Sequence, residues 1–195
     1  MHISEGVLSA SVLLSGAIVS AGGTFVGLKN LKYDDYPKIA LLTSSFFVAS
    51  LIHIPVGPAS VHLVLNGLIG ILCGWRSFPL ILIALFLQGV FFQFGGLTTL
   101  GVNTANMAIP AVLSYYLFKP LLNKNPFLTG FLAGFFSIIF SCLLVALSLF
   151  LTEYHFLNIG KLFFFSHIPV ALIEGIITGF VIKFLKKIKS DIIGG

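Results

Sequence analysis

Residues 127–151 read FLTGFLAGFFSIIFSCLLVALSLFL, a stretch in which no side chain carries a charge. A helix rises about 1.5 Å per residue, so a stretch of this length exceeds the roughly 30 Å of hydrocarbon in a bilayer. In lipid, a helix satisfies all of its backbone hydrogen bonds internally, which a single strand cannot do. The stretch therefore predicts a transmembrane helix.

Six further apolar segments flank this stretch. They cover residues 7–28, 38–55, 59–74, 77–94, 103–121 and 165–188. Over the whole chain 57% of residues are hydrophobic, 9% are charged and the mean hydropathy is +1.08. This fraction of charged residues is too small to cover the surface of a water-soluble domain. We predict an all-α membrane protein in which residues 1–195 form a single integral domain with seven transmembrane helices.

The orientation follows from the basic residues in the connectors. Residues 1–6 contain Glu5 and no lysine or arginine, so the first segment lacks the positive start of a signal peptide. An outside N-terminus places ten of the eleven basic residues on the inner side, as the positive-inside rule expects, and leaves only Lys161 outside. We predict an N-out, C-in topology. The net charge of +5 then reflects topology and does not indicate a nucleic-acid partner.

Sequence signatures of catalysis are missing from the chain. It has no GxxxxGK[ST] phosphate loop, no GxSxG nucleophile elbow and no HExxH zinc motif. Cys73 and Cys142 lie in separate apolar segments and are interpreted as small packing residues. We therefore predict a protein that is not an enzyme. If ATP drives transport here, another subunit hydrolyses it.

The first two residues, Met1 and His2, form a candidate metal chelator. The α-amino nitrogen of Met1, the amide nitrogen of His2 and its imidazole close a five-membered and a six-membered ring on one cation. Three nearly coplanar nitrogens need one further donor, and square-planar nitrogen coordination suits Ni(II) or Cu(II). Deprotonation of the amide would make such binding weaken in acid. By itself the dipeptide is weak evidence.

Two histidines lie near the outer ends of the second and third segments. His62 shares a helical face with Asn66 and Gly70, and this polar stripe is expected to face the bundle interior. Ligation and interhelical hydrogen bonding are equally compatible with it. His53 is a candidate fifth ligand or entry-path residue, although an interfacial role satisfied by water or backbone is favoured.

Polar residues mark two further places. Asn103 and Asn106 follow a glycine-rich stretch; they could support a ligand, while helix capping is favoured for Asn103. His167 begins the last segment, and Glu174 lies about two helical turns further along. A buried acid in a span is a functional candidate, yet a structural role is favoured for Glu174.

Taken together, these residues resemble the CbiM/NikM family, the substrate-capture (S) subunits of energy-coupling-factor nickel/cobalt transporters. The resemblance covers essentially the whole chain. Four matches in order carry it: Met1-His2-Ile3 with Glu5-Gly6; the Pro55 to His62 turn; Gly95-Gly96-Leu97-Thr98 through Asn106-Met107; and His167-Ile168-Pro169 with Ile173-Glu174-Gly175.

The resemblance implies a six-helix S-component core with an extra N-terminal helix, in the cytoplasmic (inner) membrane of a prokaryote. It implies Ni(II) or Co(II) as transported substrate, bound by Met1, His2 and His62, with no organic cofactor. It also implies three kinds of partner: a transmembrane coupling (T) subunit, two ATPase subunits and a small accessory membrane subunit.

Two departures from the family pattern stand out. Ser4-Glu5 replaces the usual Pro-Asp, which leaves the ligand segment less preset in φ. His53 occupies a position where a different polar residue is more common. Two alternatives remain open from the residues: an S-component for an organic vitamin, in which aromatic residues would bind, and a non-transporting membrane scaffold.

Overall fold

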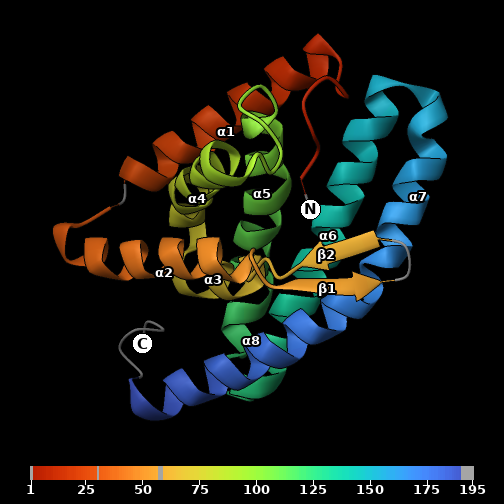
Figure 1. Cartoon of the computed structure of the whole chain (residues 1–195). Coiled ribbons are helices and arrows are strands. Elements are labelled where there is room, and N and C mark those ends of the chain that lie inside the picture. The colour runs from red at the N-terminus through yellow and green to blue at the C-terminus, as the bar shows by residue number, and fades with distance from the viewer. Residues whose placement is uncertain (1, 30, 57–58, 190–195) are drawn as a thin grey trace.

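The computed structural model describes residues 2–29, 31–56 and 59–189, and these residues fold mainly into helices (Figure 1). In chain order the elements are α1 (Ala10–Lys29), α2 (Tyr36–Ala49), β1 (His53–Val56), β2 (Ala59–His62), α3 (Asn66–Cys73), α4 (Ser77–Phe92), α5 (Leu100–Phe118), α6 (Pro126–Thr152), α7 (Leu157–Ser166) and α8 (Ile168–Ile188). Short 3₁₀ turns occur at Tyr33–Asp35, Gly74–Arg76, Lys119–Leu121 and Tyr154–Phe156.

The helical membrane class is confirmed. Within the described ranges, four stretches are long and apolar enough to cross a bilayer: Ala10–Lys29, Asn66–Phe92, Pro126–Thr152 and Tyr154–Ile188. Large apolar side chains such as Leu14, Phe25 and Phe184 are exposed on the outside of these helices, as lipid-facing residues are. The count of seven spans, the single domain and the N-out orientation stay predictions.

Two predicted spans differ from the structure. The segment 38–55 was expected to be one helix, but α2 ends at Ala49 and the chain enters an antiparallel hairpin that pairs His53 with His62. Pro55 has no N–H for a helical bond and favours extended backbone at Ile54, so the helix cannot continue. The segment 59–74 is likewise divided into strand β2 and the eight-residue helix α3.

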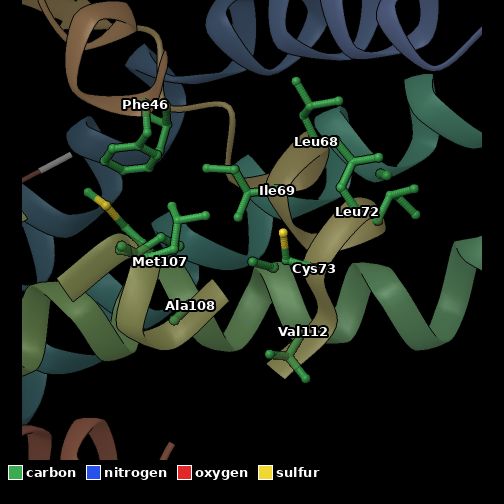
Figure 2. Close-up of a cluster of buried hydrophobic side chains, with 14 of the residues drawn as sticks. Phe46, Leu68, Ile69, Leu72, Cys73, Met107, Ala108 and Val112 are labelled. Atoms are coloured by element: carbon green, nitrogen blue, oxygen red, sulfur yellow. The ribbon is translucent and has the colours of Figure 1, made fainter. Parts of the chain in front are cut away.

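Helix α3 lies in the middle of the molecule, between α5 and α6. Its Gly67 and Gly70 allow this, because a Cβ on either would come within 2.4 Å of backbone atoms of Ala133 or Ala111, respectively. Figure 2 shows side chains of α3, among them Ile69 and Cys73, in the core that includes Met107 of α5. Cys73 and Cys142 are buried free thiols, consistent with their predicted packing role.

The residues before α1 form the most informative irregular segment. Residues 2–9 run from the start of α1 back into the molecule, between α5 and α6 (Figure 1). Ile3 and Leu8 are buried there against a small apolar cluster that includes Val102 of α5 and Val145 of α6. The backbone N–H of Ser9 also donates to the Thr152 hydroxyl. This burial brings His2 to the centre of the fold.

Candidate metal centre

The side chains of His2 and His62 meet at the end of strand β2, although sixty residues separate them in the sequence. The Nδ1 atom of His2 lies 3.1 Å from the Nε2 atom of His62, and the ring centroids are 4.8 Å apart. The predicted pairing of these two histidines is therefore present as a contact. Met1, the third predicted ligand, lies outside the described residues.

Both imidazoles are held by their other ring nitrogen. The Nδ1 atom of His62 lies 2.9 Å from the backbone carbonyl oxygen of Leu63. The Nε2 atom of His2 lies 2.8 Å from Oε1 of Gln88 on α4. In metal sites, hydrogen bonds of this kind orient the ring and fix which nitrogen carries the proton.

The protonation state of His2 suits a metal ligand. Burial lowers the pKa of His2 from 6.5 to about 3, since a charged imidazolium is poorly solvated inside the fold. His2 is therefore neutral at physiological pH. A neutral ring keeps one nitrogen lone pair, which is what a cation requires.

Asn103 clamps the N-terminal segment one residue beyond His2. Its Oδ1 accepts from the Ile3 N–H at 2.9 Å, and its Nδ2 donates to the Ile3 carbonyl at 3.0 Å. The favoured interpretation of Asn103 as a helix cap is wrong, because α5 begins at Leu100 with Thr99 as its N-cap residue. Asn103 lies inside α5. Its side-chain amide pairs with both the N–H and the carbonyl of Ile3, as the backbone of a neighbouring β-strand would.

The glycine-rich loop between α4 and α5 makes room for the same segment. A Cβ at Gly96 would come within 1.9 Å of Cγ of Glu5, and Gly95 has a φ of +79°, in the left-handed region. The Glu5 carboxylate accepts from the Thr98 N–H at 3.1 Å. The loop thus receives the turn after His2.

Glu174 holds the segment that follows His62. Its carboxylate, fully buried on α8, accepts hydrogen bonds from the backbone N–H groups of Val64 and Leu65, the latter at 3.0 Å and 3.1 Å. Leu65 has a φ of 55°, a left-handed conformation that is unfavourable for leucine. The carboxylate therefore stabilises the irregular turn after His62, and this turn fixes the position of His62 in the fold.

We expect Glu174→Ala to lower thermal stability. It would leave the buried N–H group of Val64 and the partly buried one of Leu65 without this acceptor, and each buried group left unpaired costs about 1–3 kcal/mol. For a chain of this size, a loss of at least 2 kcal/mol corresponds to a fall in melting temperature of roughly 4–8 °C. The measurement is thermal unfolding in detergent, followed by tryptophan fluorescence or circular dichroism.

The matched control is Glu153→Ala, which removes an exposed carboxylate that pairs with the exposed ring of His155. It is expected to unfold at the temperature of the parent. Equal melting temperatures for the parent and Glu174→Ala would contradict the anchoring role.

The remaining predicted residues lie elsewhere in the fold. Asn66 bonds Ser137 and Ser141 of α6, and Asn106 bonds Ser148. These contacts are interhelical hydrogen bonds, and none of them touches either histidine of the site. The Nδ1 atom of His167 lies 2.8 Å from the Phe163 carbonyl oxygen, one helical turn earlier. His53 pairs with His62 through the backbone, and its side chain is outside the described part of the structure.

Sequence reasoning missed Gln88. It is the one polar side chain in the apolar run 78–92, and that isolation was the available signal. An amide placed in an otherwise apolar span is expected to face a polar partner inside the protein. Among the described residues, no three His, Cys, Asp or Glu side chains form a cluster. Any site at His2 and His62 therefore needs donors besides such side chains.

Comparison with known proteins places this geometry in context. The profile of a family described as "CbiM: Cobalt uptake substrate-specific transmembrane region" matches residues 2–192. A Haemophilus influenzae relative named "Putative metal transport protein" is 43% identical over 98% of this chain and 96% of its own length. The "Cobalt transport protein CbiM" of Clostridium tetani is 30% identical over 100% of this chain and 89% of its own.

A solved structure has the same fold. The protein titled "Crystal Structure of an Truncated Transition metal Transporter" superposes with a TM-score of 0.82 at 26% identity, over 96% of this chain and 99% of that one. Sequence and structure thus match over the same, nearly complete length. The resemblance stated from the four motifs is confirmed.

Proposed function

The chain belongs to the CbiM family of cobalt uptake transmembrane proteins, and on that premise we propose that it is the substrate-capture subunit of an ATP-driven nickel or cobalt importer. One observation carries the proposal: Nδ1 of His2 and Nε2 of His62 face each other at 3.1 Å. The ion is the transported substrate, received at the outer face of the membrane.

The hydrogen bonds of the two rings support a cation between them. A backbone carbonyl only accepts, so His62 donates from Nδ1 to Leu63, and its Nε2 is the nitrogen left to bind a cation. With Gln88 presenting Oε1, His2 donates from Nε2 and carries its lone pair on Nδ1. Two lone pairs that face each other repel, and a shared cation turns that repulsion into two coordinate bonds.

The distance between the two nitrogens agrees with this arrangement. Metal–imidazole bonds of about 2.0 Å hold two adjacent nitrogens of a square plane about 2.8 Å apart. The separation of 3.1 Å is close to that value, so small ring movements suffice for joint coordination. Among the described residues, by contrast, no carboxylate or thiol joins the two histidines in a group of three such side chains.

The remaining donors in the proposal come from the chain start. His2 supplies its amide nitrogen and Met1 its amine, so that three nitrogens of the first dipeptide and Nε2 of His62 complete a plane. Four nitrogens in a plane favour Ni(II). In the Irving–Williams order, Cu(II) would bind such a site more tightly than Ni(II), and Co(II) would bind it more weakly. The Asn103 clamp on Ile3 supports this role because it fixes the backbone next to the chelate.

Energy coupling in the proposal is supplied by partners. The chain has no phosphate loop, so two ATPase subunits would act on it through a transmembrane coupling subunit, with a small accessory membrane subunit as a further partner. The loaded subunit would then rock within the inner membrane to release the ion. The family membership and the apolar helices support this assignment.

The experiment that tests the function is metal analysis of the purified protein. We expect about one Ni(II) per chain after purification with nickel and exhaustive washing, with a visible absorption band typical of square-planar nickel. Cobalt loading should give weaker retention. The measurement is elemental analysis combined with absorption spectroscopy, on protein that carries its tag at the C-terminus. Metal at the level of the detergent blank would contradict the proposal.

A further inference from the structure

The side chain of Gln88 has an unusual balance of hydrogen bonds. It is fully buried on α4, and its Oε1 lies 2.8 Å from Nε2 of His2. Its Nε2 has no hydrogen-bond partner among the described residues. A buried amide donor without an acceptor costs about 1–3 kcal/mol, and such a group calls for an explanation beyond packing.

The fixed donor on His62 constrains what His2 can do. Because His62 donates from Nδ1 to the Leu63 carbonyl, its Nε2 acts as an acceptor in the neutral ring. In the absence of a cation, the contact of 3.1 Å is attractive only if His2 donates from Nδ1. His2 would then carry its lone pair on Nε2, the atom that faces Gln88.

An amide side chain can serve both tautomers of His2. The oxygen and nitrogen of the Gln88 amide are nearly equal in size, so a half-turn about the last side-chain bond exchanges an acceptor for a donor at the same place. The NH₂ group suits a lone pair on Nε2 of His2, and the carbonyl suits an Nε2–H group. A leucine at this position would offer neither.

We infer that Gln88 is a positioning residue that sets the tautomer of His2 according to whether the metal site is loaded. In the empty site, His2 donates from Nδ1 to His62, and the Gln88 NH₂ donates to Nε2 of His2. In the loaded site, Nδ1 of His2 binds the cation and Nε2–H donates to Oε1 of Gln88. One proton leaves Nδ1 and one is taken up at Nε2, so this change releases no net proton.

This inference rests on the proposed metal capture and adds a reason for reversible binding. The loaded arrangement gains one hydrogen bond from Gln88, and the empty arrangement gains another. The loaded hydrogen bond is the stronger one, because a cation on Nδ1 of His2 makes its Nε2–H a better donor, so Gln88 favours binding overall. The weaker bond of the empty site offsets part of this gain, and the ion is held without being trapped. A substrate-capture subunit must release its ion inward, so a residue that serves both states suits that task.

The test compares nickel affinity in Gln88→Leu, Gln88→Glu and the parent. Gln88→Leu is expected to bind nickel about 10-fold more weakly, the lower end of the usual effect of losing the hydrogen bond behind a ligating histidine, because it also removes the weaker bond of the empty site. Gln88→Glu keeps a carboxyl oxygen toward His2 and should bind at least as tightly as the parent. Affinities are measured by competition with a chelator. Gln93→Asn, a change of an exposed amide just after the same helix that suits the left-handed φ of 56° there, is the control.

A second readout follows the proton itself. Nitrogen-15 spectra of labelled histidine distinguish a protonated Nδ1 from a protonated Nε2. The parent should show Nδ1–H for His2 without metal and Nε2–H with nickel. An unchanged affinity in Gln88→Leu, or an Nε2–H tautomer already present without metal, would overturn the inference. A parent protein that binds no nickel would contradict the proposed function. A parent that binds nickel, with either of the two results above, would contradict only the role of Gln88.

Discussion

One residue added before Met1 is expected to abolish nickel retention by this protein. The addition converts the amine of Met1 into an amide and moves the new amine away from the His2 ring. The chelate then loses a donor and its five-membered ring. Retained nickel should fall from about one ion per chain to about a tenth of that or less, because the plane of four nitrogens is no longer complete.

The same reasoning sets the control. In Figure 1 the C-terminal end of helix α8 lies away from the start of the chain, so a tag placed after that helix should leave nickel binding unchanged. Histidine at position 2 is bulky, which disfavours removal of the initiator methionine, and an intact mass would check that Met1 is retained. Both tagged proteins are purified with nickel and analysed for metal. Equal metal in the two would remove the chelate from the site.

Local patterns predicted the helices well and the hairpin poorly. Residues 127–151 correspond closely to α6, because a long apolar run in lipid has few alternatives to a helix. Strands β1 and β2 were assigned to helical spans, since short apolar runs fit either structure. Pro55 indicated that the helix ends before it, but the prediction of one span over 38–55 followed the hydropathy of the segment.

Contacts distant in sequence explain why the site was only partly predicted. His2 and His62 could be proposed because the first forms a local chelator and the second belongs to a recognisable turn. Asn103 was assigned by a local capping preference, whereas its partner Ile3 is one hundred residues away. Gln88 and Glu174 act on His2 and on the turn after His62 through the tertiary fold, and no local spacing reports such contacts.

The hairpin also provides the comparison that separates ligation from folding. His53 and His62 are opposite each other on β1 and β2, so replacing either one changes the same small element. Only His62 is known to contact the His2 ring, at 3.1 Å. A variant at His53 can therefore report the effect of a hairpin change alone, provided that the four-nitrogen plane is complete without it.

We expect His62→Ala to lose retained nickel while keeping its helical fold. It removes the proposed fourth nitrogen, and the loss of a direct ligand should exceed the 10- to 100-fold effect typical of an outer hydrogen bond. His53→Asn should still bind about one nickel per chain if the four-nitrogen plane is complete. Elemental analysis gives the metal content, and circular dichroism gives the helicity. Unchanged nickel in His62→Ala would exclude His62 as a ligand, and an equal loss in His53→Asn would make His53 part of the site. A loss confined to His62→Ala would point to the contact of His62 with His2 as the reason, because both variants alter the same hairpin.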